Sequence, residues 1–153
     1  MSETVQYTIA EPSLEQLVTS VQPLRHDVLD RARLVTTDET LSAEDFLHDV
    51  IHRAAFIDGV AVSAVRVDAI ATNSLHAMIR KMATLDGYSK LGIGSKVLGT
   101  AEEQATQQGV RNFWLDARES AIPFFEKNGY MSTNNTITHE DGVLKYRMFK
   151  RAT

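Results

Sequence analysis

The sequence predicts an α+β fold in which helices flank a mainly antiparallel sheet. Two pairs of strand-like segments are each joined by an Asp-Gly turn, at Asp58-Gly59 and at Asp141-Gly142, and such turns are typical of hairpins. Segments with apolar residues at helical spacing separate the other strands. Because the chain has 153 residues and no Pro/Gly/Ser-rich linker, we expect a single domain spanning residues 1–153.

The N-terminal part predicts a short strand over residues 5–10, followed by a helix. Ser13 has a glutamine three positions later, the capping-box pattern that begins a helix. Apolar residues recur at spacings of three and four as far as Ala32, and Pro23 predicts a bend within the helix. Around Ser42 the sequence favours a second, short capped turn.

The middle of the chain predicts three successive strands and a helix. Residues 51–57 and 60–67 are rich in Val, Ile and Ala and form the arms of the first hairpin. A long apolar strand follows over residues 75–85. The next helix begins near Gly94 and ends at Gly109, because glycine readily adopts the left-handed conformation that closes a helix.

The C-terminal part predicts a short strand over residues 110–115, then a helix over 119–128. Gly129 is placed to end that helix. Residues 130–138 and 143–150 form the arms of the second hairpin.

Composition excludes several classes of protein. The net charge is −4 and the basic residues are scattered, so no nucleic-acid partner is expected. The absence of cysteine excludes disulfides, thiolate metal sites and an acyl-thioester enzyme. His48 and His52 are four residues apart, but a strand at His52 spoils the geometry of a helical metal pair, and no metal is expected. With no leader and no apolar run long enough for a bilayer, we expect a cytoplasmic protein without a membrane partner.

The segment over residues 82–98 carries the main chemical signal. It reads as a strand, a turn and the start of a helix, with Gly92 and Gly94 at the turn. A helix N-terminus attracts phosphate, and glycines let the backbone approach an anion closely. A flexible loop before a helix is the alternative interpretation. Nucleotide-triphosphate and dinucleotide loops are excluded, because the first needs Gly-Lys-Ser/Thr and the second a third glycine.

Two elements of the sequence resemble the GNAT superfamily of N-acetyltransferases. Residues 89–94, Ser-Lys-Leu-Gly-Ile-Gly, are similar to the family signature Arg/Gln-x-x-Gly-x-Gly/Ala, except for Ser89 at the first position. Residues 116–130 resemble the family element Asn-Ala-x-x-x-Ala-x-x-Phe-Tyr-Glu-Lys-x-Gly-Phe. Residues 24–29 and 79–83 also fit, so the resemblance covers about 14–150.

The resemblance implies a GNAT-like sheet in which the parallel strands 75–85 and 110–115 splay apart and hold acetyl-CoA as cosubstrate. In the family, backbone groups near the end of the first strand bond the pantetheine arm, and the following loop holds the pyrophosphate. The expected acetyl-CoA-binding residues are accordingly Met82, Ala83, Thr84, Lys90, Leu91, Gly92, Ile93, Gly94 and Ser95, with Phe124 and Phe125 packed on the pantetheine arm.

The implied reaction is direct attack of an amine on the thioester, without a covalent enzyme intermediate. The acceptor would be an amine-bearing small molecule or peptide, and a homodimer is one assembly that the chain could form. Phe125 stands where the family usually has a tyrosine acid, and Asp116 replaces the usual asparagine. The loss of the phenol keeps open an alternative function, a non-catalytic acyl-CoA-binding regulatory module.

Several residues are candidates for proton transfer or acceptor binding. His52 is a candidate general base because histidine titrates near neutrality; the alternative is a buried histidine bonded to backbone. Tyr88 and Tyr146 are candidates for the missing acid. Arg80 shares a strand face with Met82 and is a candidate contact for the acceptor or for a carboxylate.

The segment over residues 37–49 is acidic and contains no Lys or Arg. If it lies over the acceptor side of the cleft, its field would favour cationic acceptors. The alternative is a solvated surface loop. The carboxylates concerned are Asp38, Glu39, Glu44, Asp45 and Asp49.

Overall fold

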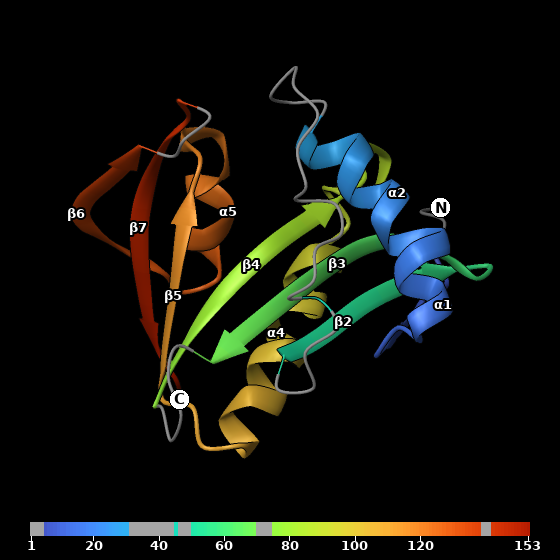
Figure 1. Cartoon of the computed structure of the whole chain (residues 1–153), viewed down its shortest axis with the longest axis horizontal. Coiled ribbons are helices and arrows are strands. Elements are labelled where there is room, and N and C mark those ends of the chain that lie inside the picture. Colours follow the sequence, from blue (N-terminus) through green and yellow to red (C-terminus); the bar gives the residue numbers. More distant parts are fainter. Residues whose placement is uncertain (1–4, 31–44, 46–49, 70–74, 139–141) are drawn as a thin grey trace.

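The computed structural model describes residues 5–30, 45, 50–69, 75–138 and 142–153. Seven strands form one sheet in the order β1-β2-β3-β4-β5-β7-β6, and helices lie on both of its faces (Figure 1). All neighbouring strands are antiparallel except β4 and β5, which are parallel. The prediction of an α+β fold with a mainly antiparallel sheet is confirmed.

The bounds of the elements follow the sequence prediction closely. The strands are β1 (Thr8–Ala10), β2 (Val50–Ile57), β3 (Val60–Ala69), β4 (His76–Thr84), β5 (Asn112–Ala117), β6 (Met131–Thr138) and β7 (Leu144–Arg151). The helical segments are α1 (Leu14–Gln16), η1 (Leu17–Val21), α2 (Gln22–Arg25), η2 (His26–Asp30), η4 (Asp86–Tyr88), α4 (Ile93–Gln107), η5 (Glu119–Ala121) and α5 (Ile122–Lys127).

The N-terminal helical stretch begins at the predicted capping box. The Ser13 hydroxyl accepts from the Gln16 backbone N–H at 3.1 Å, and the Gln16 side chain accepts from the Ser13 N–H at 2.9 Å. The four segments from α1 to η2 follow one another without a gap, and wide π turns flank α2. Pro23 lies in the first turn of α2, where its missing N–H is tolerated. The turn predicted around Ser42 lies outside the described residues.

The turn between β2 and β3 has the backbone that the Asp-Gly pair predicts. Asp58 has φ 51° and Gly59 has φ 79°, and two positive φ angles are what a tight type I′ hairpin turn requires. In the second hairpin Gly142 also has a positive φ, 80°, while Asp141 lies outside the described residues.

Two apolar clusters bury the two faces of the sheet. One lies between the sheet and α4, and the other lies between the sheet and the N-terminal helical stretch, as the layers in Figure 1 indicate. The helical contributions to the α4 cluster are Ile93, Val97, Leu98, Ala101 and Ala105. The helical contributions to the second cluster are Leu17, Val21 and Leu24.

The parallel strands β4 and β5 pair only at their beginnings. The pairs are His76 with Asn112, Ala77 with Phe113 and Met78 with Trp114. Both strands then continue, β4 to Thr84 and β5 to Ala117, without further pairing to each other. The predicted splayed parallel pair is therefore present.

A bulge in β4 was not predicted. The β3–β4 register passes from Arg66 opposite Arg80 to Ala64 opposite Ala83, so β4 contains one extra residue. Lys81 lies in this step and has φ 54°. A left-handed lysine has no sequence signature, because that conformation ordinarily favours Gly, Asn or Asp.

None of the helices in the described ranges has both the length and the apolar character required to cross a bilayer.

Candidate functional site

A cavity of about 430 Å³ lies where β4 and β5 separate. Its walls come from residues 79–82 of β4 and 115–117 of β5, with Val28 and Leu29 of η2 covering one side. Phe125 of α5 closes another part of the wall. The cavity therefore lies between the two strands that the resemblance implies to hold acetyl-CoA.

The residues predicted to bind acetyl-CoA gather around the end of β4 and the start of α4. Met82 lines the cavity. Ala83 is 3% exposed and pairs with Ala64. The hydroxyl of Thr84 shares a 2.8 Å hydrogen bond with the hydroxyl of Ser63. Since β4 has no strand partner on its β5 side beyond Met78, that edge can pair with an extended ligand.

The local structure explains why glycine stands at two positions at the start of α4. Gly92 has φ 77° and is the residue that caps the helix. A Cβ on Gly94 would lie 2.8 Å from Thr84 Oγ1 and 3.3 Å from Phe124 Cε1, so glycine lets α4 begin directly against β4. The Lys96 N–H donates to Gly92 O, four residues earlier. The N–H groups before it, from Ile93 onwards, have no such partner within the helix. They carry the partial positive charge of a helix N-terminus.

The C-terminal end of α5 is fixed against the start of α4. Asn128 donates one bond to Ser95 Oγ at 3.1 Å and another to Phe124 O at 2.8 Å. Phe125 is 6% exposed and packs edge-on against both Phe124 and Tyr130. The rings of Phe124 and Phe125 thus lie beside the predicted acetyl-CoA path, although each also belongs to the core. Lys90 and Leu91 are exposed in the preceding loop.

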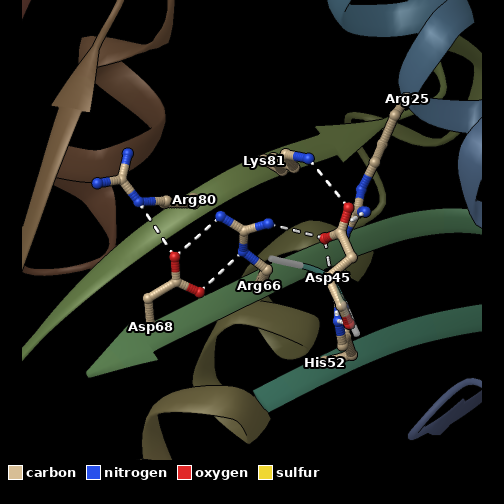
Figure 2. Close-up of polar contacts among 7 residues, drawn as sticks. All are labelled: Arg25, Asp45, His52, Arg66, Asp68, Arg80 and Lys81. Atoms are coloured by element: carbon tan, nitrogen blue, oxygen red, sulfur yellow. Dashed lines mark hydrogen bonds and ion pairs between the residues drawn. The ribbon is translucent and has the colours of Figure 1, made fainter. Parts of the chain in front are cut away.

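A buried ion cluster lies next to the cavity, centred on Asp45 (Figure 2). The Asp45 carboxylate lies 3.2 Å from Arg25 Nη1, 2.9 Å from Arg66 Nη1 and 3.0 Å from Lys81 Nζ. Its side chain has no exposed surface. Asp45 is therefore not part of a solvated surface loop, and it adds no unmatched charge to a negative field, because three cations contact it. The other carboxylates of that acidic segment lie outside the described residues.

The cluster continues to Asp68, which two arginines hold. Arg66 Nη2 donates to Asp68 Oδ2 at 2.9 Å, and Arg66 Nε lies 2.8 Å from Oδ1. Arg80 Nε lies 3.2 Å from Oδ2. Arg66 is 4% exposed, whereas the Arg80 side chain is 46% exposed.

Burial and charge act in opposite directions on the cations of this cluster. Burial lowers the pKa of Arg25 and of Lys81 more than the Asp45 carboxylate raises it. Burial would also lower the pKa of Arg66, but its bonds to Asp45 and Asp68 raise the pKa overall. The two carboxylates therefore hold Arg66 firmly in its charged form.

His52 lies against Asp45 in this cluster and is not among the described residues that line the cavity. Its Nε2 lies 2.8 Å from the backbone carbonyl of Asp45; because a carbonyl only accepts, Nε2 carries the proton. Burial lowers the pKa of His52, despite the bond to Asp45. Nδ1 is buried without a hydrogen-bond partner among the described residues. This is the geometry of the alternative interpretation, a buried histidine bonded to backbone.

The lowered pKa of His52 predicts a dependence of stability on pH. The unfolded chain takes up a proton at this histidine near pH 6.5, whereas the folded protein does so only at lower pH. The contribution of His52 to the free energy of unfolding should therefore be complete above about pH 6.5 and decrease as the pH drops below that value. In His52→Gln the fall in the free energy of unfolding should be smaller, as measured by urea unfolding between about pH 7 and pH 5. An unchanged fall would contradict the assignment.

Tyr88 and Tyr146 are not among the described residues that line the cavity, and neither is His52. Tyr88 ends η4 and packs against the core, and Tyr146 pairs with Ala117 in the sheet. Ser120 carries the one hydroxyl among those lining residues. The roles of His52 and Tyr88 in proton transfer stay predictions.

Sequence reasoning singled out Arg80 and Asp116 but not the other charged residues in the cavity wall. Asp116 lines the cavity and is held by Arg147, through Nε at 2.8 Å and Nη2 at 3.1 Å. A signal for Arg66 existed, because it is the one charged residue of the predicted strand 60–67. The cationic residues among the described lining are Arg66, Arg80, Lys81, Arg118 and Lys145.

Comparison with known proteins agrees with this fold. The sequence model described as the Acetyltransferase (GNAT) family matches residues 16–130. The uncharacterized N-acetyltransferase YitI of Bacillus subtilis is 26% identical over 111 residues, covering 70% of this chain and 73% of YitI.

Solved structures show the same fold. A Lactobacillus plantarum protein described as an N-acetyltransferase superposes with a TM-score of 0.80 at 22% identity, covering 96% of this chain and 99% of the other. An aminoglycoside 6′-N-acetyltransferase complexed with coenzyme A gives 0.77 at 14% identity, covering 94% and 96%.

Proposed function

Because the chain belongs to the Acetyltransferase (GNAT) family, we propose that it transfers an acetyl group from acetyl-CoA directly to an amine. The observation that carries this proposal is the cavity at the splayed end of β4 and β5, with the N-terminus of α4 next to it. A thioester in the cavity and a pyrophosphate at the helix would use both features at once.

The donor is bound by backbone more than by side chains. The N–H groups at the start of α4, near Gly92 and Gly94, bond the pyrophosphate, since they are unpaired within the helix. The pantetheine arm lies along the unpaired edge of β4 beside Met82 and Thr84. A solved relative of the same fold is a complex with coenzyme A, which supports a donor of this class.

The transfer itself needs no covalent enzyme intermediate. The neutral amine nitrogen attacks the thioester carbonyl carbon, and an N–H of β4 near the bulge at Lys81 stabilises the developing oxyanion. The C–S bond then breaks, the amide is formed and CoA leaves as thiolate. The ammonium proton goes to water or to a base. The absence of cysteine is consistent with direct transfer.

Catalysis in this cavity relies mainly on positioning. Phe125 lines the wall where a phenol would be expected and cannot donate a proton. CoA thiol is acidic enough to leave as the anion, so the loss of the acid is tolerated. Holding the amine against the thioester removes the entropy cost of a bimolecular encounter.

Thiol release with a panel of amines tests the proposal. Acetyl-CoA is mixed with the protein and with primary amines that range from neutral to cationic and zwitterionic, and free CoA thiol is followed over time. We expect amine-dependent release with at least one acceptor and tight binding of acetyl-CoA by calorimetry. Binding without release across the panel would favour a non-catalytic acyl-CoA-binding module.

A further inference from the structure

The cavity wall presents cationic side chains to whatever occupies the acceptor side. Among the described lining residues, five are Arg or Lys and one, Asp116, is a carboxylate. Asp116 is held at both oxygens by Arg147, so its charge is matched within the protein. A cationic acceptor would meet little unmatched negative charge on this part of the wall.

Arg80 is the cation best placed to bind a ligand. It is 46% exposed, lines the cavity and contacts Asp68 through Nε alone. Figure 2 shows its two terminal nitrogens on the side of the guanidinium away from Asp68. No other ion pair of Arg80 exists within the described part of the chain.

Arg80 reaches only Oδ2 of Asp68, the oxygen that also accepts from Arg66 Nη2, while Oδ1 lies on the side of Arg66 Nε. The carboxylate holds the guanidinium of Arg80 at Nε and leaves both terminal nitrogens without an ion-pair contact among the described residues. An arginine held by one edge and exposed at the other is pre-organised to receive a planar anion with two parallel bonds.

From this geometry we infer that the acceptor amine carries a carboxylate, which the terminal nitrogens of Arg80 bind while the amine faces the thioester. This inference rests on the proposed function and names its substrate class. It is opposite in sign to the preference for cationic acceptors that the acidic segment 37–49 led us to expect. The carboxylate is either the α-carboxyl group of a free amino acid or an acidic side chain near the N-terminus of a peptide.

The first test compares matched acceptors. Each standard amino acid is paired with its α-amide. Short peptides with Asp or Glu as the second residue are paired with the same peptides carrying the side-chain amide, Asn or Gln, at that position. The wild type should prefer the carboxylate member by about tenfold to a hundredfold in kcat/KM, since a charge-assisted bidentate pair contributes about that much. Preference in the amino-acid arm or in the peptide arm identifies the source of the carboxylate.

Variants at position 80 connect the preference to the residue. Arg80→Gln should remove it by raising KM for the carboxylate member, while the amide member and the KM for acetyl-CoA stay within about twofold. Arg80→Lys should keep part of it, because the charge remains but the fork is lost. The control is Arg151→Gln, which lies at the end of the β5–β7 ladder away from the cavity. This variant should behave as the wild type. A preference that is absent, or that survives in Arg80→Gln, overturns the inference.

A binding measurement separates this inference from the proposed function. N-acetylated amino acids and their amides, which are the products of the proposed reaction, are titrated by ligand-observed NMR in the presence of CoA. Arg80-dependent binding of the carboxylate form without any turnover would support the acceptor site and reject the transfer. Turnover with equal binding of both forms would support the transfer and reject the carboxylate site.

Discussion

Replacing Asp45 with Asn is expected to lower the free energy of unfolding by about 3 kcal/mol or more, since it removes the negative charge from a buried cluster. Arg25, Arg66 and Lys81 all contact this carboxylate at 3.2 Å or less. The melting temperature should fall by roughly 10 °C for a domain of this size. Urea unfolding and thermal scanning at neutral pH give both quantities.

The control for this variant is Asp86→Asn, which makes the same chemical change at an exposed position in η4. It should alter stability by no more than about 0.5 kcal/mol. In the double variant Asp45→Asn with Lys81→Met, part of the loss should be recovered, because one buried cation is removed with its partner. If Asp45→Asn were as mild as Asp86→Asn, the buried cluster would not hold residue 45 against the sheet.

The second large effect concerns acetyl-CoA. Gly92→Glu should weaken binding by about tenfold to a hundredfold relative to Gly92→Lys, because the glutamate places a negative charge beside the expected pyrophosphate. Both variants share the same strain at φ 77°, and a Cβ at this glycine meets no atom within 4 Å. Their difference therefore isolates the charge from the backbone. Calorimetric titration of acetyl-CoA measures it.

Salt and a neutral variant sharpen this comparison. The ratio between Gly92→Glu and Gly92→Lys should shrink as the salt concentration rises toward molar, where the screening length is about 3 Å. Gly92→Gln should bind with intermediate strength. Equal affinities for the two charged variants at low salt would mean that the pyrophosphate does not lie at the start of α4.

Local signals in the sequence predicted most of the fold. The Asp58-Gly59 turn set the first hairpin, since both residues adopt the positive φ angles that the pair favours. Ser13 began the first helix through its capping box, and the strand-turn-helix around Gly92 located the loop before α4. Each of these depends on the chemistry of a few neighbouring residues.

Contacts between distant segments could not be predicted in this way. Asp45 joins residues from α2, β3 and β4, and nothing in its own segment distinguishes it from a surface carboxylate. The position of β7 between β5 and β6 and the left-handed Lys81 likewise depend on tertiary packing. Arg66, Arg80 and Lys81 come together in the cavity wall through such contacts, so its charge could not be predicted from neighbouring residues in the sequence.

The most direct test of the proposed acetyl transfer uses acetyl-CoA labelled in the acetyl group, followed by mass spectrometry of amine, CoA and intact protein in one quenched reaction. Direct transfer predicts label in the amine as an amide, one free CoA for each amide formed, and no labelled protein when the amine is left out. Labelled protein that passes its label to a later-added amine would contradict direct transfer, and CoA release without any labelled amide would contradict acetyl transfer itself.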